Sequence, residues 1–172
     1  MAVKKIYLYI ILLIFFTNKS FACQLLNVPI GTNVSSAVST FEFIDAYSAD
    51  LYGDEFSAKY EDYAQEYCEG SSLENSDLEV IVYKSKIAGI NLVNSHNNSK
   101  NEIYEFVKSF ISDPGSETKS NNWTGYKNLS IGDLLIFYGK TKIANETIEY
   151  LEITNPEMID FTIGERVMNA TG

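Results

Sequence analysis

The sequence has 172 residues, of which 13 are basic and 23 acidic, giving a formal net charge of −10, and 45% of its residues are hydrophobic. This composition excludes an intrinsically disordered chain, and the negative charge argues against binding to nucleic-acid phosphates or to anionic lipid. The length and the apolar content predict one soluble domain with a hydrophobic core.

Residues 1–22 have the three parts of a secretory signal peptide. Two lysines precede eleven consecutive apolar residues at 6–16, and small residues stand at positions −3 and −1 of a cleavage site after Ala22. A helix of that length rises roughly 16 Å, which is too short to span a hydrocarbon core of about 30 Å. We therefore expect an exported protein, periplasmic or secreted, whose mature domain is 23–172 and has no stable membrane span.

Cys23 and Cys68 are the only cysteines, and two uses of Cys23 are open. A disulfide between them persists in an exported compartment and closes a loop of about 45 residues, which stabilises the fold by about 3–4 kcal/mol. Cys23 also stands where a lipoprotein carries its lipid, although Ser20 occupies the −3 position that usually holds Leu, Val or Ile. We predict the disulfide and keep the lipid anchor as the alternative.

The first half of the mature chain contains one helical pattern and one ambiguous segment. Apolar residues at three- and four-residue steps predict an amphipathic helix over 33–46, followed by a loop at 47–55. Residues 56–68 carry tyrosines at helical spacing, which favours a short helix, although the alternation at the start of this segment is typical of a strand.

The middle of the chain predicts a hairpin and then a helix. Two runs rich in Val, Ile and Tyr, at 78–84 and 87–93, are joined by a short polar link, which is typical of a β-hairpin. An unbroken apolar stripe predicts a helix over 101–112, and Ser99 followed by Glu102 fits a capping box.

The last third predicts more strands. Strand character returns at 133–138 and 147–153 after an aromatic turn at 123–126, and 158–163 is predicted as a last short strand. Helices that precede hairpins define an α+β fold, with two or three helices packed on an antiparallel sheet built from β-hairpins.

One internal sequence similarity bears on the origin of this fold. A shift of 56 residues aligns 85–88 with 141–144, and each copy lies in a predicted hairpin that follows a helix. Either a duplicated helix-plus-hairpin unit or the shared composition of strands explains the similarity.

No catalytic, metal or cofactor motif stands out in the sequence. Nucleophilic catalysis by a Ser–His or Cys–His pair needs an imidazole, and His96, the only histidine, lies in a polar loop at 94–100. One histidine cannot supply a zinc cluster, and the acids at 45–55 match no EF-hand spacing. The sequence has no phosphate-binding glycine loop. We therefore predict no catalytic residue, no metal ligand and no cofactor.

The acidic residues are concentrated between Glu42 and Glu79, where 12 of them are opposed only by Lys59. A concentrated negative field speeds the encounter with a cationic partner, and tyrosines beside acids suit a protein contact. Two plainer explanations are open: a solvated surface that keeps the protein soluble, and tyrosines that form half-buried edges of the core. The candidate partner surface consists of Tyr52, Asp54, Glu55, Tyr60, Glu61, Asp62 and Tyr63.

These features favour a non-enzymatic protein-binding module, such as an inhibitor or immunity-type protein that recognises a basic partner. A carboxylate-based hydrolase is the first alternative, and it requires two acids facing one pocket. A lipid-anchored envelope structural protein is the second alternative, and it depends on Cys23 alone. We expect no nucleic-acid partner, and the sequence indicates no oligomeric state.

Overall fold

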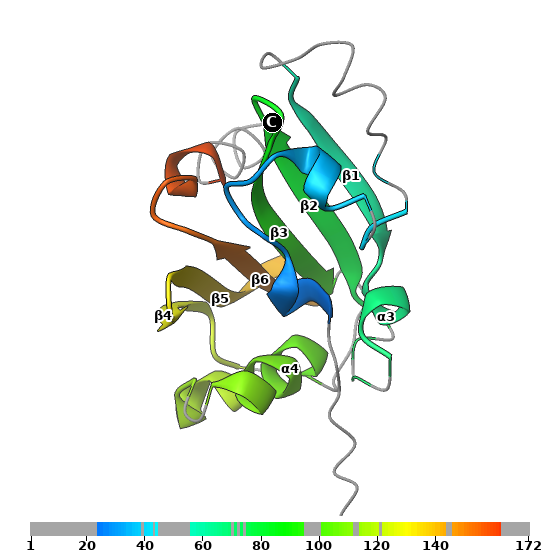
Figure 1. Cartoon of the computed structure of the whole chain (residues 1–172). Helices are drawn as coiled ribbons and strands as arrows, with labels where there is room; N and C mark the ends of the chain where they lie inside the picture. The colour runs from blue at the N-terminus through cyan, green and yellow to red at the C-terminus, as the bar shows by residue number, and fades with distance from the viewer. Residues whose placement is uncertain are drawn as a thin grey trace, which may run out of the picture.

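The computed structural model describes residues 24–38, 40–42, 44, 56–69, 71, 73, 75–94, 101–111, 114–120, 122–143 and 146–162. Its body is a six-stranded antiparallel sheet in the order β1-β2-β3-β6-β5-β4 (Figure 1). The strands are β1 (Ala58–Tyr63), β2 (Asp77–Tyr83), β3 (Lys86–Asn94), β4 (Gly125–Ile131), β5 (Leu134–Ile143) and β6 (Glu146–Thr154). The helical segments are η1 (Gln24–Asn27), η2 (Val34–Ser36), α3 (Ala64–Tyr67), α4 (Glu102–Phe110) and η4 (Ser116–Lys119).

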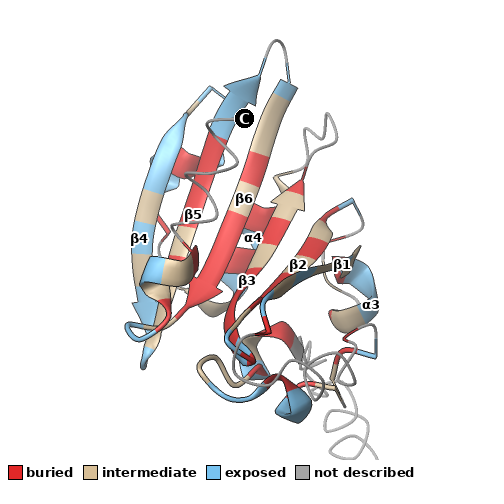
Figure 2. Cartoon of the chain, turned by 90° about the horizontal axis from the view of Figure 1, so that it is seen from above, coloured by how far each residue is buried: buried red, intermediate tan, exposed pale blue. Residues whose placement is uncertain are grey.

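The sheet consists of two three-stranded meanders that meet at its centre (Figure 2). Strands β1, β2 and β3 pair in sequence order, as do β4, β5 and β6, and the ladder between β3 and β6 joins the two sets. In this central ladder Ile90 lies opposite Ile153, and Leu92 lies opposite Leu151. Helix α4 follows β3 in the chain and contacts both β3 and β6, so it covers the junction of the two meanders.

One face of the sheet is the core face. Strand residues alternate between the two faces, so Leu78, Val80 and Val82 of β2 all point to the same side, where each is at most 2% exposed. This face packs against the apolar side of α4 and against the described residues of 24–44, drawn in blue in front of the sheet (Figure 1). The covering residues that are buried there are Leu25, Val28, Val34, Ala37, Phe41, Ile44, Ile103, Tyr104, Phe106 and Val107.

The opposite face is covered at one end by residues 156–162. A second, smaller apolar cluster there joins Met158 to Ile81 of β2. The rings of Tyr83 and Phe161 stack with centroids 3.9 Å apart. The end covered by residues 156–162 lies near the β2–β3 turn. The start of β2 lies at the opposite end of this face.

The β2–β3 turn has left-handed backbone conformations without glycine. Lys84 has φ 48° and Ser85 has φ 58°, the signs that a two-residue type I′ turn requires. Non-glycine residues pay a steric cost there, roughly 1–2 kcal/mol each, so the surrounding contacts must hold the turn. Ser85 N–H donates to the Phe56 carbonyl, and the Ser85 carbonyl accepts from Val34 N–H, each at 2.8 Å.

The expected α+β class agrees with this architecture, and several predicted elements are confirmed. The hairpin at 78–93 is β2–β3, the helix at 101–112 is α4, and the strands at 133–138 and 147–153 lie in β5 and β6. Among the described residues, no helix is long and apolar enough to cross a membrane.

Among the described residues of 33–44, the helix predicted over 33–46 is wrong beyond its first turn, and residues 39, 43, 45 and 46 lie outside the described part of the chain. The structure has the short 3₁₀ helix η2, which Asn33 caps by accepting Ser35 N–H on its Oδ1, and the described residues after it form turns. Ser36 Oγ donates to the Asn33 carbonyl, a local side-chain bond to the backbone of the kind that favours turns over a continuous helix. Phe41 and Ile44 are nevertheless buried, since successive turns advance an apolar stripe in steps of three and four, as a helix does.

Three other expectations are corrected. Residues 56–68 are mainly the strand β1, with alternating burial, and only the single turn α3 is helical, so the preference for a helix was wrong there. Residues 159–162 are helical where a strand was predicted over 158–163. Strand β4 was not predicted, because the sequence analysis assigned only an aromatic turn to its start.

The proposed duplication of a helix-plus-hairpin unit is not confirmed. The 56-residue shift aligns Ser85, which lies in a turn, with Thr141, which lies inside β5. The sequence similarity therefore does not superimpose the turn of the first hairpin on that of the second.

Gly139 in β5 provides a test of the packing on the sheet face opposite the core. A Cβ atom added there would lie 2.3 Å from the Cζ and hydroxyl oxygen of Tyr150, the residue opposite it on β6. We expect Gly139→Ala to lower the free energy of unfolding by about 1–3 kcal/mol, the usual cost of overpacking, in urea denaturation followed by Trp123 fluorescence. In a Tyr150→Ala background the same change should cost much less. Equal losses in the two backgrounds would show that the ring is not the cause.

Candidate functional site

A groove lies on the face opposite the core, at the end of β1 and β2 away from residues 156–162. Its volume is about 420 Å³. Strand register assembles it, because Glu61 pairs with Glu79 and Tyr63 pairs with Asp77, and directly opposed residues share one face of a sheet. The lining residues are Glu61, Asp62, Tyr63, Asp77, Glu79 and Val93.

Lys59 is shared by two carboxylates of the groove. Its Nζ lies 2.8 Å from Glu61 Oε1 and 3.1 Å from Glu79 Oε1. The hydrogen bond to Glu61 is the main cause that raises the pKa of Lys59, and Glu79 adds to it. Four acidic side chains and this one shared cation leave the groove negative. Asn91 Nδ2 also donates to Glu79 Oε2 at 3.2 Å, which fixes the orientation of that carboxylate.

Asp62 is held at the rim of the groove by the helical turn that follows β1. The hydroxyl of Tyr67 donates to Asp62 Oδ2 at 2.8 Å, and Tyr63 N–H donates to Asp62 Oδ1 at 2.8 Å. Burial of the Tyr67 ring, which packs 5.1 Å from Phe41, is the main cause that raises its pKa, followed by the bond to Asp62. The tyrosine therefore keeps its proton and acts as a donor.

The structure brings together part of the predicted partner surface. Glu61, Asp62 and Tyr63 line the groove, whereas Tyr60 is partly buried and packs against the core from the other face. Tyr60 is therefore a correction: β1 is a strand, so its neighbours Glu61 and Tyr60 point to opposite sides. The remaining predicted residues, Tyr52, Asp54 and Glu55, lie outside the described residues.

The groove also contains residues that lie outside the candidate partner surface. Asp77 and Glu79 belong to the acidic segment, but only the pairing of β2 with β1 places them beside Glu61. Val93 comes from β3, which pairs with β2. The described part of the chain holds no cluster of three or more His, Cys, Asp or Glu side chains arranged for a metal ion. His96 and Cys23 lie outside the described residues, and Cys68 is buried in the core.

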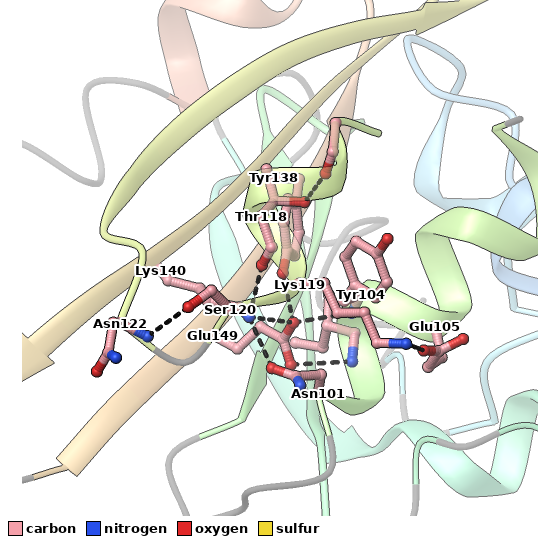
Figure 3. Close-up of polar contacts among 12 residues, drawn as sticks. Asn101, Tyr104, Glu105, Thr118, Lys119, Ser120, Asn122, Tyr138, Lys140 and Glu149 are labelled. Atoms are coloured by element: carbon pink, nitrogen blue, oxygen red, sulfur yellow. Dashed lines mark hydrogen bonds and ion pairs between the residues drawn. The ribbon is translucent and has the colours of Figure 1, made fainter. Parts of the chain in front are cut away.

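A second polar site is buried between α4 and the sheet (Figure 3). The Glu149 carboxylate of β6 accepts the N–H groups of Ile103 and Tyr104 at 3.1 and 2.8 Å, in the first turn of α4. It also accepts the Tyr138 hydroxyl of β5 at 2.6 Å. Since the first N–H groups of a helix have no partner within it, Glu149 serves as the cap that Ser99 and Glu102 were predicted to provide.

Glu102, predicted to complete a capping box, has a different role. Its carboxylate accepts from the backbone N–H and the side-chain amide of Asn75, at 3.0 and 2.9 Å. Asn101, which precedes the helix, has φ 53° and makes no side-chain cap. Ser99 lies outside the described residues. The first turn of α4 is thus fixed from outside the helix, by Glu149.

Lys140 supplies the positive charge of the buried site. Its Nζ lies 4.0 Å from Glu149 Oε1, and it donates to Asn101 Oδ1 at 2.6 Å and to the Thr118 carbonyl at 2.8 Å (Figure 3). The two charged side chains are only 1% and 5% exposed. Four segments therefore meet at this pair: β5, β6, the start of α4 and the end of η4.

Burial controls protonation in this cluster. It raises the pKa of the Glu149 carboxyl and lowers the pKa of Lys140, because each charged form loses hydration. The bond from Tyr138 and the charge of Lys140 oppose the shift on Glu149. Burial and then the Glu149 charge raise the pKa of Tyr138, which remains a donor. With 1% and 5% of their side chains exposed, Lys140 and Glu149 cannot meet a substrate, so we assign the cluster a structural role.

The sequence carries a signal for this cluster in the alternation of two strands. In β6, Glu149 alternates with Leu151 and Ile153, and in β5, Lys140 alternates with Tyr138 and Ile136. Alternation places each charged residue on the core face of its strand. A buried charge requires a partner, so one acid and one lysine on adjacent strands indicate an ion pair.

Comparison with known proteins gives no match: no family model, no curated protein and no solved structure matches this chain. The geometry of the groove and of the buried cluster is therefore the basis for assigning a function.

Replacing Lys140 with methionine leaves the Glu149 carboxylate buried without its cation. We expect the free energy of unfolding at pH 7 to fall by about 3–5 kcal/mol. Without Lys140, the folded-state pKa of Glu149 rises further above its usual value of 4.5. A raised pKa gives stability that is present below the unfolded value and is lost as the pH rises through the folded value. The deficit in urea denaturation should therefore be smaller at pH 5 than at pH 7.

Lys142→Met is the matched control for this prediction. Lys142 lies two residues further along β5 and is exposed, so its loss should change stability by less than about 0.5 kcal/mol. Similar losses in the two variants, or a Lys140→Met deficit that is independent of pH, would contradict the role assigned to the buried pair.

Proposed function

We propose that the chain is a non-enzymatic protein-binding module that recognises a basic partner through the acidic groove. The observation that carries this proposal is the groove of about 420 Å³, which four acidic residues line, with Glu61, Asp77 and Glu79 on the same face of the sheet. The Tyr63 side chain at its edge is 65% exposed. An inhibitor or immunity-type protein directed against a basic enzyme is one concrete form of such a module.

The lining of the groove suits a lysine or arginine side chain from a partner. Carboxylates accept charge-assisted hydrogen bonds from such cations, and an exposed tyrosine ring adds a favourable face for stacking. The groove is also rigid, because Glu61 and Glu79 share Lys59, and Tyr67 holds Asp62. Preorganised side chains lose less entropy when a partner binds. The formal charge of −13 on residues 23–172, from ten basic and 23 acidic residues, would steer a basic partner toward this surface.

A carboxylate-based hydrolase remains the alternative that the groove itself raises, since Glu61 and Glu79 face each other in it. Acid catalysis by a carboxyl group requires an environment that favours its neutral form, either burial or a second carboxylate without a cation. The Glu61 side chain is 65% exposed, and both carboxylates pair with Lys59, so neither lies in the buried, cation-free setting that such a catalyst needs. Binding therefore fits the groove better than hydrolysis does.

Export and a Cys23–Cys68 disulfide complete the proposal. The signal-like residues 1–22 support export to the periplasm or the medium. Leu25, two residues after Cys23, is buried in the same apolar cluster as Cys68, which supports a bridge between these two parts of the chain. A lipid on Cys23 would instead make the chain an anchored envelope protein, and one sulfur cannot serve both purposes.

Charge reversal in the groove tests the binding proposal. We expect the chain to retain a basic protein from an exported-protein fraction at low salt and to lose it at high salt, because exposed charges are screened beyond a Debye length of about 10 Å at 0.1 M. Glu61→Lys should abolish retention at low salt. Glu146→Lys is the control, since Glu146 is exposed at the start of β6 and lies outside the groove lining. Equal retention by both variants, or retention that is indifferent to salt, would exclude the groove as the binding surface.

The intact mass of the protein purified from producing cells tests export and the state of Cys23 together. We expect an N-terminus at Cys23, no attached lipid, and a mass that increases by two hydrogens on reduction. Reduction should also lower the free energy of unfolding by about 3–4 kcal/mol. A chain that still begins at Met1 with two reactive thiols would contradict export, and a lipid mass on Cys23 would favour the anchored alternative.

A further inference from the structure

Strand β4 is an edge of the sheet that the described residues leave open. It pairs only with β5, so its outer row of backbone N–H and C=O groups has no neighbouring strand (Figure 2). Five of its seven residues are exposed. Among the described residues, four large hydrophobic side chains are exposed, and three of them lie on β4 or at the end of β5: Tyr126, Ile131 and Ile143.

The two edges of the sheet differ in how they discourage pairing. Half of the residues of β1 are charged: Lys59, Glu61 and Asp62. Charges of this kind protect an edge strand against addition of another strand. Strand β4 has no proline, no acid and no register shift against β5, and its single charge, on Lys127, is paired with Glu117 of the same chain. The β4 edge is therefore much less protected.

We propose that a second copy of this chain pairs with β4, antiparallel and about a two-fold axis through Asn128, to form a continuous twelve-stranded sheet. An antiparallel pair of identical strands is self-complementary and closed, so assembly ends at the dimer. Centring the axis on Asn128, the middle of Gly125–Ile131, uses all seven residues of β4 in the ladder. Any other register leaves residues of both strands unpaired.

The side chains of β4 suit this register. With Asn128 on the axis, Tyr126 of each copy faces Ser130 of the other, and Lys127 faces Leu129, so no two like charges are directly opposed. Ile131 of the second copy lies over Gly125, whose missing side chain leaves room beside the Trp123 ring, 3.4 Å from where a Cβ would stand. The exposed aliphatic and aromatic groups of the edge are thus covered by the pairing.

The distribution of charge favours this edge over the other. The acidic groove lies on β1 and β2, at the far side of the sheet from β4. Five strand spacings separate β4 from β1, which amounts to about 24 Å, and a dimer through β4 places the two grooves at opposite ends. At physiological salt the Debye length is about 8 Å, so repulsion between the two grooves is screened. Pairing through β1 would bring the acidic surfaces together.

Sedimentation of the purified protein over a range of concentrations tests the dimer. We expect a monomer–dimer equilibrium in which Asn128→Lys lowers the dimer fraction several-fold, because a residue on the axis faces its own copy. Tyr63→Lys adds the same charge to the β1 edge and should leave the dimer intact. A wild-type monomer at all concentrations, or a dimer lost in Tyr63→Lys and retained in Asn128→Lys, would overturn the proposal.

Cysteine cross-linking tests the register independently of charge. Cα atoms directly opposed in an antiparallel ladder lie about 4.5–5.5 Å apart, within the range that a disulfide spans, so Asn128→Cys should cross-link two copies on oxidation. Tyr126→Cys is the matched control, since the two copies of that residue are offset by four positions, roughly 13 Å. Cross-linking at 126 and not at 128, or at neither position, would contradict a two-fold axis through Asn128. Neither experiment depends on a partner in the groove, so the dimer and the proposed function can fail separately.

Discussion

The Glu149 carboxylate is the contact on which the arrangement of helix and sheet depends. It takes the first free N–H groups of α4, the hydroxyl of Tyr138 and the charge of Lys140, and so fixes the helix to β5 and β6. Because α4 covers the junction of the two meanders, its position determines how the apolar faces of β3 and β6 are closed from water. An ion pair of this kind is not by itself a large source of stability, but the bonds from Ile103 and Tyr104 N–H to Glu149 attach the first turn of the helix to β6.

With the core face closed in this way, the other face of the sheet is divided along its length. Residues 156–162 cover the end near Ile81 and Tyr83, and the end that begins with Asp77 carries the groove. The same strand β2 therefore contributes apolar residues to packing at one end and carboxylates to a surface at the other. Alternation along β1 and β2 keeps Glu61, Asp77 and Glu79 on the face away from the core, so these acids do not weaken it.

The elements that could be predicted from the sequence are those whose residues bury a periodic apolar face. The β2–β3 hairpin belongs to this group because Val80 and Ile90 are buried residues of strands with regular apolar patterns. Helix α4 belongs to it because Ile103 and Val107 lie one helical turn apart. Strand β4 was missed since an exposed edge strand buries little, and Leu129 is its only partly buried large apolar residue. The segment after Asn33 was predicted as a helix because consecutive turns can bury apolar residues at the same three- and four-residue spacing as a helix. For the groove, Glu61, Asp62 and Tyr63 were predicted, but their meeting with Asp77 and Glu79 depends on strand register, which no local pattern specifies.

The order of strands also has a consequence for how the chain folds. Each meander joins segments close in sequence, whereas the central ladder requires Ile90 to find Ile153, across more than sixty intervening residues. Contacts of such long sequence separation close slowly, because the entropy of a large loop is lost before the contact contributes. We therefore expect the two halves to gain structure early and the union of β3 with β6 to limit the rate. A newly synthesised chain would then pass through a stage with two half-sheets, each with an apolar edge not yet covered.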